Sequence, residues 1–481
     1  MSITSALNTA MTGLTAAGRA SSVVSENLAN ALTPGYSKRS LTLSSGVNAP
    51  GVQIVGVGRN VDPAIQASRR STEAELGGAQ VQSDFYDRLT GLVGSVDDPF
   101  SVTSRLSNFE GSLIEAISRP DSGPRLNDLS LQAEALAETI SEAAEGLRSL
   151  RSTADRSIDT QVDTINQALK DVQKVNARIM VSQAGGMDTA ALLDQRAQLI
   201  DQVNEIIPVN VVQRDNGQVA LFTQGGAILL DGQPAELTFD GKPDTMPHMT
   251  QANGLLSGLE INGYAIDTGP NGPLRGGTMA AQFEVRDVLA VEAQSDLDSM
   301  ARDLIERFQD PALDATLGAT DPGLFTDGGG FFDPTNTVGI ANRMELNEKI
   351  SMDGDSETWR LRDGINAAAP GDAGDARLLQ GYTDALGVMR TVTSDGLGTS
   401  TVTATTLSAN LLSHFSQSTN AADQALSFAS ASFSAMSQME LAQGVDTDEE
   451  LQNLMVIEQA YGANAKLMSV VNELMETLLR I

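Results

Sequence analysis

Apolar side chains recur at alternating steps of three and four positions at both ends of the chain. This spacing predicts helices that each present one continuous apolar seam to a partner helix. The N-terminal seam, in which Ser21 is the polar member, comprises Ile3, Leu7, Ala10, Leu14, Ala17, Val24 and Leu28. The C-terminal seam, in which Asn464 is the polar member, comprises Leu454, Ile457, Tyr461, Met468, Val471, Met475 and Leu478.

Start and stop signals delimit the two terminal helices. Pro34 and Gly35 stop the first helix, because proline excludes the helical conformation from the residue before it. Thr447 and Glu450 have capping-box spacing at the start of the last helix. We expect the two helices to pair as a coiled coil, with each other or with neighbouring subunits, since a lone amphipathic helix leaves its seam in water. The alternative is that they cover an ordinary core.

The same alternating spacing of apolar residues predicts a long helix over residues 126–181. Its apolar positions keep the alternating step until Ala154 and resume at Ile158 after a second four-residue step, which is typical of a stutter in a coiled coil. Further helices are expected at 190–207, 278–309 and 376–443, the last interrupted at 394–398. Residues 310–375 are rich in Gly, Asp, Pro and Asn and predict a long irregular excursion.

From Val209 onward the pattern changes to short runs of β-branched and apolar residues. Turn signals separate these runs, among them Asp215-Asn216-Gly217 and Asp231-Gly232, which are typical of hairpins. A small β domain inserted into a helical body is therefore predicted.

The predicted fold is multi-domain and mainly α with a β insertion. We expect a rod with both termini at one pole and the insertion projecting at the other. The predicted parts are a terminal coiled-coil domain of residues 1–35 and 445–481, a helical-bundle body of 36–207 and 278–444 that includes the excursion 310–375, and an inserted β domain of 208–277.

Composition narrows the functional classes. The chain has 481 residues, with 31 Lys and Arg against 62 Asp and Glu, a formal net charge of −31. Nucleic acids and anionic membranes are bound by clustered basic side chains, so neither is an expected partner. There is no Cys, and no basic, apolar secretory signal or run of about 18 apolar residues is apparent. We therefore expect a cytosolic protein or one exported by another route.

The search for catalytic chemistry is mostly negative. Neither a dinucleotide-binding nor a P-loop glycine pattern is present. The two histidines, His248 and His414, are far apart in sequence and are expected to be structural or exposed. The acidic turn at 353–357 lacks the spacing of a calcium-binding loop. We predict a protein that is not an enzyme and has no metal or cofactor; the open alternative is a hydrolase that uses carboxylates in the 310–375 segment.

Two sets of motifs resemble those of the bacterial axial flagellar family, which comprises rod, hook and hook-associated proteins. The N-terminal motif comprises Asn27, Leu28, Ala29, Asn30, Thr33, Pro34, Gly35 and Tyr36. The residues 445–450 look like the matching C-terminal signature. Within the family, the segment with Asp194, Gln195 and Arg196 and the run Phe283–Asp287 are similar to segments of the hook-associated protein 1 branch.

The resemblance implies a structural protein that forms a ring at the junction of hook and filament. It implies export in an unfolded state through the flagellar type III apparatus, an extracellular location, and terminal helices that order on assembly. The implied partners are further copies of the chain, the hook protein, hook-associated protein 3 and an export chaperone that binds the C-terminal part. Another axial protein, such as a hook or rod component, is the alternative, which the segment with Asp194 disfavours.

Overall fold

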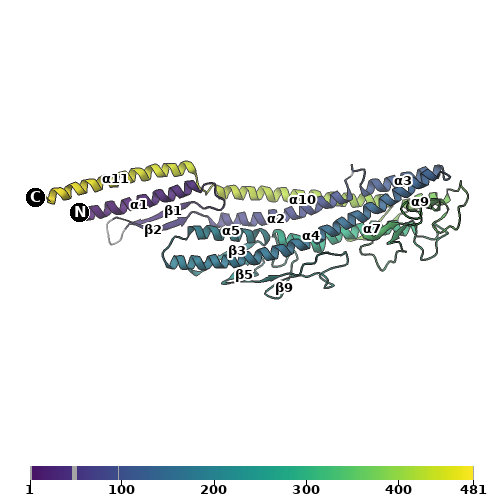
Figure 1. Cartoon of the computed structure of the whole chain (residues 1–481), viewed down its shortest axis with the longest axis horizontal. Helices are drawn as coiled ribbons and strands as arrows, with labels where there is room; N and C mark the ends of the chain where they lie inside the picture. The colour runs from purple at the N-terminus through teal and green to yellow at the C-terminus, as the bar shows by residue number, and fades with distance from the viewer. Residues whose placement is uncertain (1–2, 46–50, 96, 480–481) are drawn as a thin grey trace.

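The computed structural model describes residues 3–45, 51–95 and 97–479. They form a long rod in which both termini lie at the same end (Figure 1). The described helices are α1 (Ile3–Ala29), α2 (Pro63–Val93), α3 (Val102–Ser118), α4 (Gly123–Ala184), α5 (Ala190–Ile206), α6 (Gly277–Glu284), α7 (Ala290–Phe308), α8 (Arg360–Asp363), α9 (Arg377–Gly387), α10 (Ala404–Leu441) and α11 (Thr447–Leu479).

The strands are short and form five small antiparallel sheets in the described part of the chain. They are β1 (Arg39–Ser45), β2 (Val52–Arg59), β3 (Val209–Gln213), β4 (Val219–Thr223), β5 (Ile228–Asp231), β6 (Gln233–Pro234), β7 (Leu237–Thr238), β8 (Leu259–Ile261), β9 (Tyr264–Ile266), β10 (Phe325–Asp327), β11 (Met344–Leu346), β12 (Arg390–Ser394) and β13 (Gly398–Val402). The expectation of a mainly helical chain with a β insertion is confirmed.

The helix α4 runs through most of the body and contributes to two hydrophobic cores. Its seam up to Ala154 packs with α2, α3, α7, α9 and α10, and its seam from Ile158 packs with α5, α6 and strands β3 to β8. The four-residue step predicted between these two residues therefore coincides with the change of core. The continuous buried seam explains why such a long helix forms, because tertiary burial rather than intrinsic propensity stabilises most helices.

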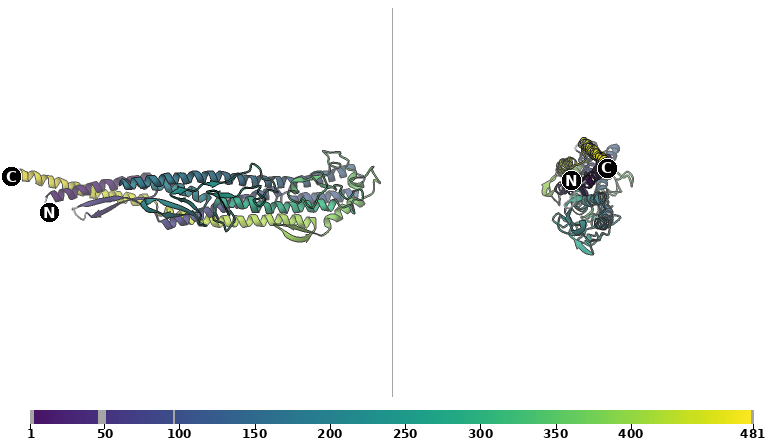
Figure 2. Two further views of the ribbon diagram at one scale, coloured as in Figure 1. Left: turned by 90° about the horizontal axis from the view of Figure 1, so that it is seen from below. Right: turned by 90° about the vertical axis from the view of Figure 1, so that its left-hand side faces the viewer.

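The β insertion lies along the flank of the rod and not at its far pole, which corrects our expectation (Figures 1 and 2). The order β3-β4-β5-β6 makes one sheet and β7-β8-β9 another. Their inner side chains, such as Leu221 and Leu230, are buried against α4 and α5. A sheet this small needs a helix to cover its apolar face, so it lies flat on α4. The far pole is formed instead by α3, α9 and part of the excursion 310–375.

Three two-stranded sheets of the described chain were not predicted, and one of them, β10–β11, lies in the segment 310–375 that was expected to be irregular. Residues 376–443 were expected to be helical with a break, but β12 and β13 pair across that break, where Asp296 of α7 accepts hydrogen bonds of 3.1 Å from the N–H groups of Gly396 and Leu397. The alternation of Thr and other side chains in this hairpin favours strands over helix. Near the N-terminus, β1 and β2 form a second hairpin that packs on α1.

Candidate assembly interface

The terminal helices α1 and α11 pack side by side at one end of the rod, beyond the two cores (Figure 1). Ten of the predicted seam residues are buried or half-buried in the described chain. Ala10, Ala17, Val24 and Val471 are buried. The half-buried members are Ile3, Leu7, Leu14, Leu454, Ile457 and Met468.

The two helices approach closely at Asn464, the polar member of the C-terminal seam. A Cβ atom at Gly13 would lie 2.9 Å from the side-chain amide of Asn464, so only glycine leaves room for this amide. Asn464 itself donates a hydrogen bond of 2.9 Å to the carbonyl oxygen of Ala460. Asn464, the polar position in the C-terminal seam, therefore lies opposite Gly13 of α1, which has no side chain to displace it.

Three predicted seam residues remain largely exposed. Leu28 is 38% exposed, Tyr461 is 50% exposed and Met475 is 44% exposed. The ring of Tyr461 is thus only partly covered in the single chain, and the side chain of Leu478 lies outside the described residues.

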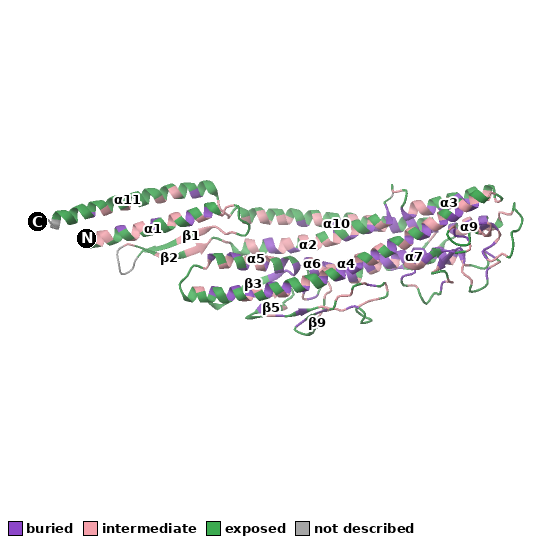
Figure 3. Cartoon of the chain, viewed as in Figure 1, coloured by how far each residue is buried: buried purple, intermediate pink, exposed green. Residues whose placement is uncertain are grey.

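Helix α11 also carries a second apolar seam, which the structure leaves uncovered. It follows steps of four, three, four, three and four residues and consists of Val456, Ala460, Ala463, Leu467, Val470 and Leu474. All six are exposed, Val456 by 66% and Leu467 by 52%, and the helix is largely green in Figure 3. At about 100° per residue this seam lies roughly a quarter turn or more from the first one. A second helix could therefore pack on α11 beside α1.

A polar cluster joins the two terminal helices to each other at the base of the pair. Asn27 is buried, and its Nδ2 donates to the carbonyl oxygen of Arg39 (2.9 Å) and to Glu450 (3.2 Å). Its Oδ1 accepts from the Tyr36 hydroxyl (2.8 Å) and from the N–H of Arg39 (2.9 Å). One side-chain amide thus fixes the turn after α1 and the first turn of α11.

Glu450 acts in this cluster and not in a capping box. The side chain of Asp446 accepts hydrogen bonds from the N–H groups of Asp448 (2.9 Å) and Glu449 (3.2 Å), so Asp446 caps α11. Glu450 is 2% exposed and lies 3.4 Å from the ammonium group of Lys38. The predicted capping box of Thr447 and Glu450 is therefore corrected. Glu450 instead accepts a hydrogen bond from Asn27 and forms an ion pair with Lys38.

Charged side chains extend the cluster to the body of the rod. Asp194 of α5 lies 2.8 Å from Nε of Arg59 and 3.5 Å from the guanidinium of Arg39. Arg39 also pairs with Glu26 at 3.0 Å and stacks over the ring of Tyr36. These ion pairs hold the β1–β2 hairpin, and with it α1, against α5.

The pKa shifts in the cluster follow from burial and pairing. Burial raises the pKa of the Tyr36 hydroxyl, although the nearby guanidinium of Arg39 opposes the shift. The hydrogen bond to Glu449 raises the pKa of Lys38. Burial lowers the pKa of Arg59, against the effect of Asp194. These directions keep the phenol neutral and the lysine charged at neutral pH.

The remaining motif residues shape the turn between α1 and β1. Gly35 has a φ of 75°, which favours glycine, and a Cβ there would lie 2.3 Å from the side chain of Gln198. That side chain donates to the carbonyl oxygen of Pro34 at 3.0 Å. The hydroxyl of Thr33 donates to Oδ1 of Asn30 at 3.3 Å. The exposed members of the motif are Leu28, Ala29, Thr33, Pro34 and Gly35.

The residues that follow Asp194 lie apart from the cluster. Gln195 is exposed, whereas Arg196 is buried and donates to Asn176 of α4 at 2.9 Å and to the carbonyl oxygen of Gly217. Burial lowers the pKa of Arg196 to about 10. Arg196 therefore anchors α5 and a β turn to α4.

Sequence reasoning missed Lys38, Arg39, Arg59 and Gln198 as members of the cluster. The signal was partly visible, because the basic pair after Tyr36 mirrors the acidic run at 448–450. Arg59 and Gln198 gave no such signal, since only the folded chain brings them to the turn.

A second buried cluster fixes the β insertion to the body. Arg286 lies in a π-helical turn, Val285–Leu289, and is completely buried. It pairs with the buried Asp155 of α4 at 2.7 Å, and its guanidinium stacks over Phe239 and Phe283. The run Phe283–Asp287 noted in the sequence therefore has a structural role.

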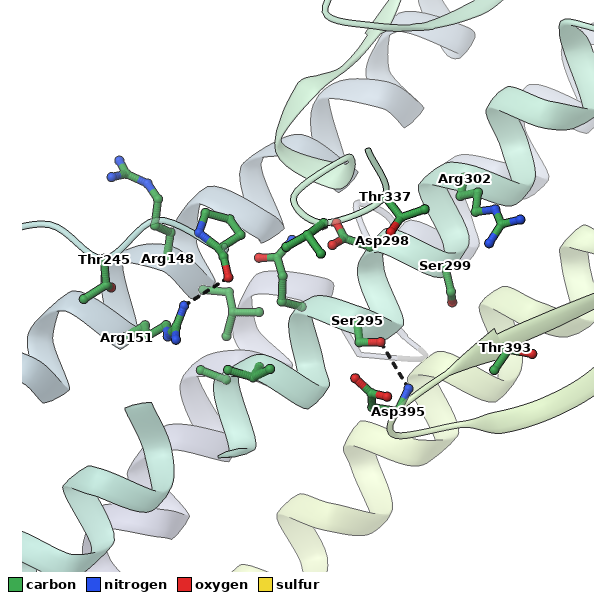
Figure 4. A pocket seen from close by; sticks show the side chains of 16 residues that line it. Arg148, Arg151, Thr245, Ser295, Asp298, Ser299, Arg302, Thr337, Thr393 and Asp395 are labelled. Atoms are coloured by element: carbon green, nitrogen blue, oxygen red, sulfur yellow. Dashed lines mark hydrogen bonds between the residues drawn. The ribbon is translucent and has the colours of Figure 1, made fainter. Parts of the chain in front are cut away.

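The body also contains a cavity of about 180 Å³ between α4, α7 and neighbouring loops (Figure 4). Its polar side chains bind the surrounding backbone. Arg151 donates to the carbonyl oxygens of Met246 (3.0 Å) and Met249 (2.6 Å), and Asp298 accepts from the N–H groups of Gly339 (2.7 Å) and Ala341 (2.9 Å). Arg151 and Asp298, which line the cavity, thus hold the neighbouring loops to α4 and α7.

The other candidates for chemistry have structural partners. His414 lies 3.1 Å from the buried Asp296, and Glu357 of the acidic turn pairs with Arg360. Among the residues that the structure describes, no three His, Asp or Glu side chains are grouped to hold a metal ion. None of the described helices has both the length and the apolar character that crossing a bilayer needs.

Three family models match the chain. The model for the helical domain of flagellar hook-associated protein FlgK matches residues 86–313. The flagella basal body rod protein model matches residues 7–36, and the model for the C-terminal part of the flagellar basal body rod FlgEFG proteins matches residues 436–481. The two rod-type models thus coincide with the segments that form the α1–α11 pair.

Relatives agree with the models. Flagellar hook-associated protein 1 of Bacillus subtilis is 24% identical, over 98% of this chain and 97% of the relative. The Salmonella typhimurium protein of the same name is 27% identical over 56% of this chain, and the match spans about half (51%) of the relative's length. The flagellar hook junction protein FlgK of Burkholderia pseudomallei matches 55% of this chain and 47% of its own, with a TM-score of 0.45 and 17% identity.

Proposed function

For this chain, which belongs to the family of flagellar hook-associated protein 1, we propose a structural role at the junction between the hook and the filament of a bacterial flagellum. In this proposal, copies of the chain assemble through α1 and α11. The chain is exported unfolded by the flagellar type III apparatus and acts outside the cell. Its further partners are the hook protein, hook-associated protein 3 and an export chaperone for the C-terminal part.

The uncovered second seam of α11 is the observation that carries this proposal. Val456, Leu467, Val470 and Leu474 remain exposed although α1 already covers the neighbouring face of the helix. Burying a large apolar side chain stabilises an assembly by about 1.5–3 kcal/mol. A helix of a neighbouring subunit would provide that burial, and the α1–α11 pair would then form part of a larger coiled coil.

The test uses a strain that lacks the chain, complemented with variants of α11. Without the chain, we expect cells to keep their hooks and to shed flagellin into the medium. Leu467→Glu places a charge in the second seam and should reduce the number of filaments at least tenfold. Ser469→Glu is the matched control, because Ser469 is exposed on the side of α11 away from both seams.

Two outcomes would contradict the proposal. If Leu467→Glu restores filaments as well as the wild-type chain does, the second seam is not an assembly surface. If the strain without the chain builds normal filaments, the chain does not form the junction.

A further inference from the structure

The outward face of α10 lacks charge between Asp423 and Glu440. Residues 424–439 contain no Asp, Glu, Lys or Arg, in a chain with 62 acidic and 31 basic residues. At 1.5 Å per residue this stretch of 16 residues is about 24 Å long. Exposed helix faces normally carry charged side chains, so this surface needs an explanation.

One side of α10 packs on α2 and accounts for part of the apolar sequence. Ala422 and Ala429 are buried there, and Leu426 and Phe433 are half-buried. These residues recur every three or four positions and form the inner face of the helix.

The opposite side is exposed and uncharged, and it mixes apolar side chains with the polar Gln424, Ser427, Ser434 and Gln438. We call its apolar members the α10 outer face; they are Ala425, Phe428, Ala431, Ala435 and Met439. Phe428 is 74% exposed and Met439 is 54% exposed, and α10 lies along the outside of the rod with green segments over this stretch in Figure 3. Large apolar side chains grouped on an otherwise polar surface mark a contact with another macromolecule.

We propose that the α10 outer face packs against a second copy of this chain. The charge of the molecule selects this partner. Two copies that each carry a net charge of −31 repel each other, and the repulsion is least where both surfaces lack charge. A basic partner would instead favour acidic surfaces such as the row of Glu134, Glu138 and Glu142 on α4.

The position of the α10 outer face supports the same partner. At its C-terminal end α10 leads through residues 442–446 to α11, whose second seam is also uncovered. A neighbouring copy could therefore contact both helices in succession. The small side chains Ala425, Ala431 and Ala435 permit a close approach, and Phe428 and Met439 supply the apolar area. The inference rests on the proposed function, since it assumes that copies of the chain assemble.

Photo-crosslinking identifies what covers the face. p-Benzoylphenylalanine replaces Phe428 in the full-length chain, and intact flagella are irradiated and analysed by mass spectrometry. We expect a covalent dimer of the chain. The control replaces Tyr264, which is 77% exposed on β9 at the opposite side of the rod (Figure 1), and should give at least fivefold less dimer.

A third position separates this inference from the proposed function. p-Benzoylphenylalanine at Leu467 probes the second seam of α11 in the same way. Crosslinking at Leu467 together with no crosslinked dimer at Phe428 overturns the inference and leaves the proposed function standing. A product that joins Phe428 to a different protein also overturns it.

Substitution by a charge gives an independent measurement. Ala435→Glu should reduce incorporation of the chain into flagella at least fivefold, whereas Ser430→Glu, on the other margin of the exposed surface of α10, should not. Both positions are exposed, so equal thermal unfolding of the two purified variants would show that folding is unaffected. Normal incorporation of Ala435→Glu would contradict the inference.

Discussion

At the scale of single residues, buried polar side chains hold the ends of distant segments together. Asn27 uses both its donor and its acceptor groups, and Asp194 contacts two arginines of the β1–β2 hairpin. A buried polar group that loses its partner costs about 1–3 kcal/mol. Such residues therefore specify one arrangement of the chain more than they add to its stability.

Asp298 gives a pH-dependent stability that can be measured. Burial raises its pKa from 3.8 to about 6, although hydrogen bonds from Ala341, Gly339 and Gln294 favour the charged form. Between about pH 4 and pH 6 the folded chain binds the proton more tightly than the unfolded chain. The stabilisation of the folded chain by protonated Asp298 is fully present below pH 4 and is lost as the pH rises through 6. The free energy of unfolding therefore falls by about 3 kcal/mol in total.

Asp298→Asn should remove that pH dependence. Between pH 4 and pH 7, the free energy of unfolding of the variant, measured by urea denaturation, should rise relative to wild type by about 3 kcal/mol. Asp333→Asn is the control, because Asp333 is exposed and the N–H of Thr335 lowers its pKa, which gives the opposite sign. A constant difference between Asp298→Asn and wild type across this range would refute the assignment.

At the scale of elements, two glycines of α1 test the pairing with α11. A Cβ at Gly13 would meet Asn464, whereas a Cβ at Gly18 would have no atom within 4 Å. Gly18→Ala should therefore stabilise α1 by about 1 kcal/mol through helix propensity alone. Gly13→Ala should gain less or lose stability, because the Asn464 amide must move.

Hydrogen exchange of the amides of α1, compared between the two variants, measures this difference. Greater protection in Gly18→Ala than in Gly13→Ala is the expected result. Equal protection would mean that α1 and α11 do not approach at Gly13 in solution.

The elements also explain what the sequence could and could not predict. Long helices such as α4 follow directly from the periodic apolar positions, and so do the two terminal helices. The β12–β13 hairpin was missed because Asp296 of α7, about a hundred residues away, stabilises its turn. Glu450 was assigned to a local cap because its true partners, Asn27 and Lys38, lie at the other end of the chain.

At the scale of the whole molecule, stability is distributed unevenly along the rod. Neither of the two described hydrophobic cores includes a residue of α1, α11 or the β1–β2 hairpin. Regions with few buried apolar contacts open more readily than core regions. In the dilute chain, trypsin should therefore cleave at the exposed Arg19 and Lys466 at least ten times faster than at Arg151, which is buried in the body.

Mass spectrometry of a limited digest would identify the resistant fragment, which should retain α2 to α10. Incorporation into flagella should protect Arg19 and Lys466. If both sites are as resistant as Arg151 in the dilute chain, the terminal pair is stable without neighbours and the proposed role of assembly in ordering it is wrong.

The contact between Asn27 and Glu450 spans 423 positions of the chain. Closing a loop of that length costs more conformational entropy than any contact within the body, and contacts of such separation form late. Glu450 also follows every element from α1 to α10 in the order of synthesis. The pole that carries both termini is therefore the last part of the molecule to be completed, and a chain threaded through a narrow channel from either end reaches the other side with this contact still unmade.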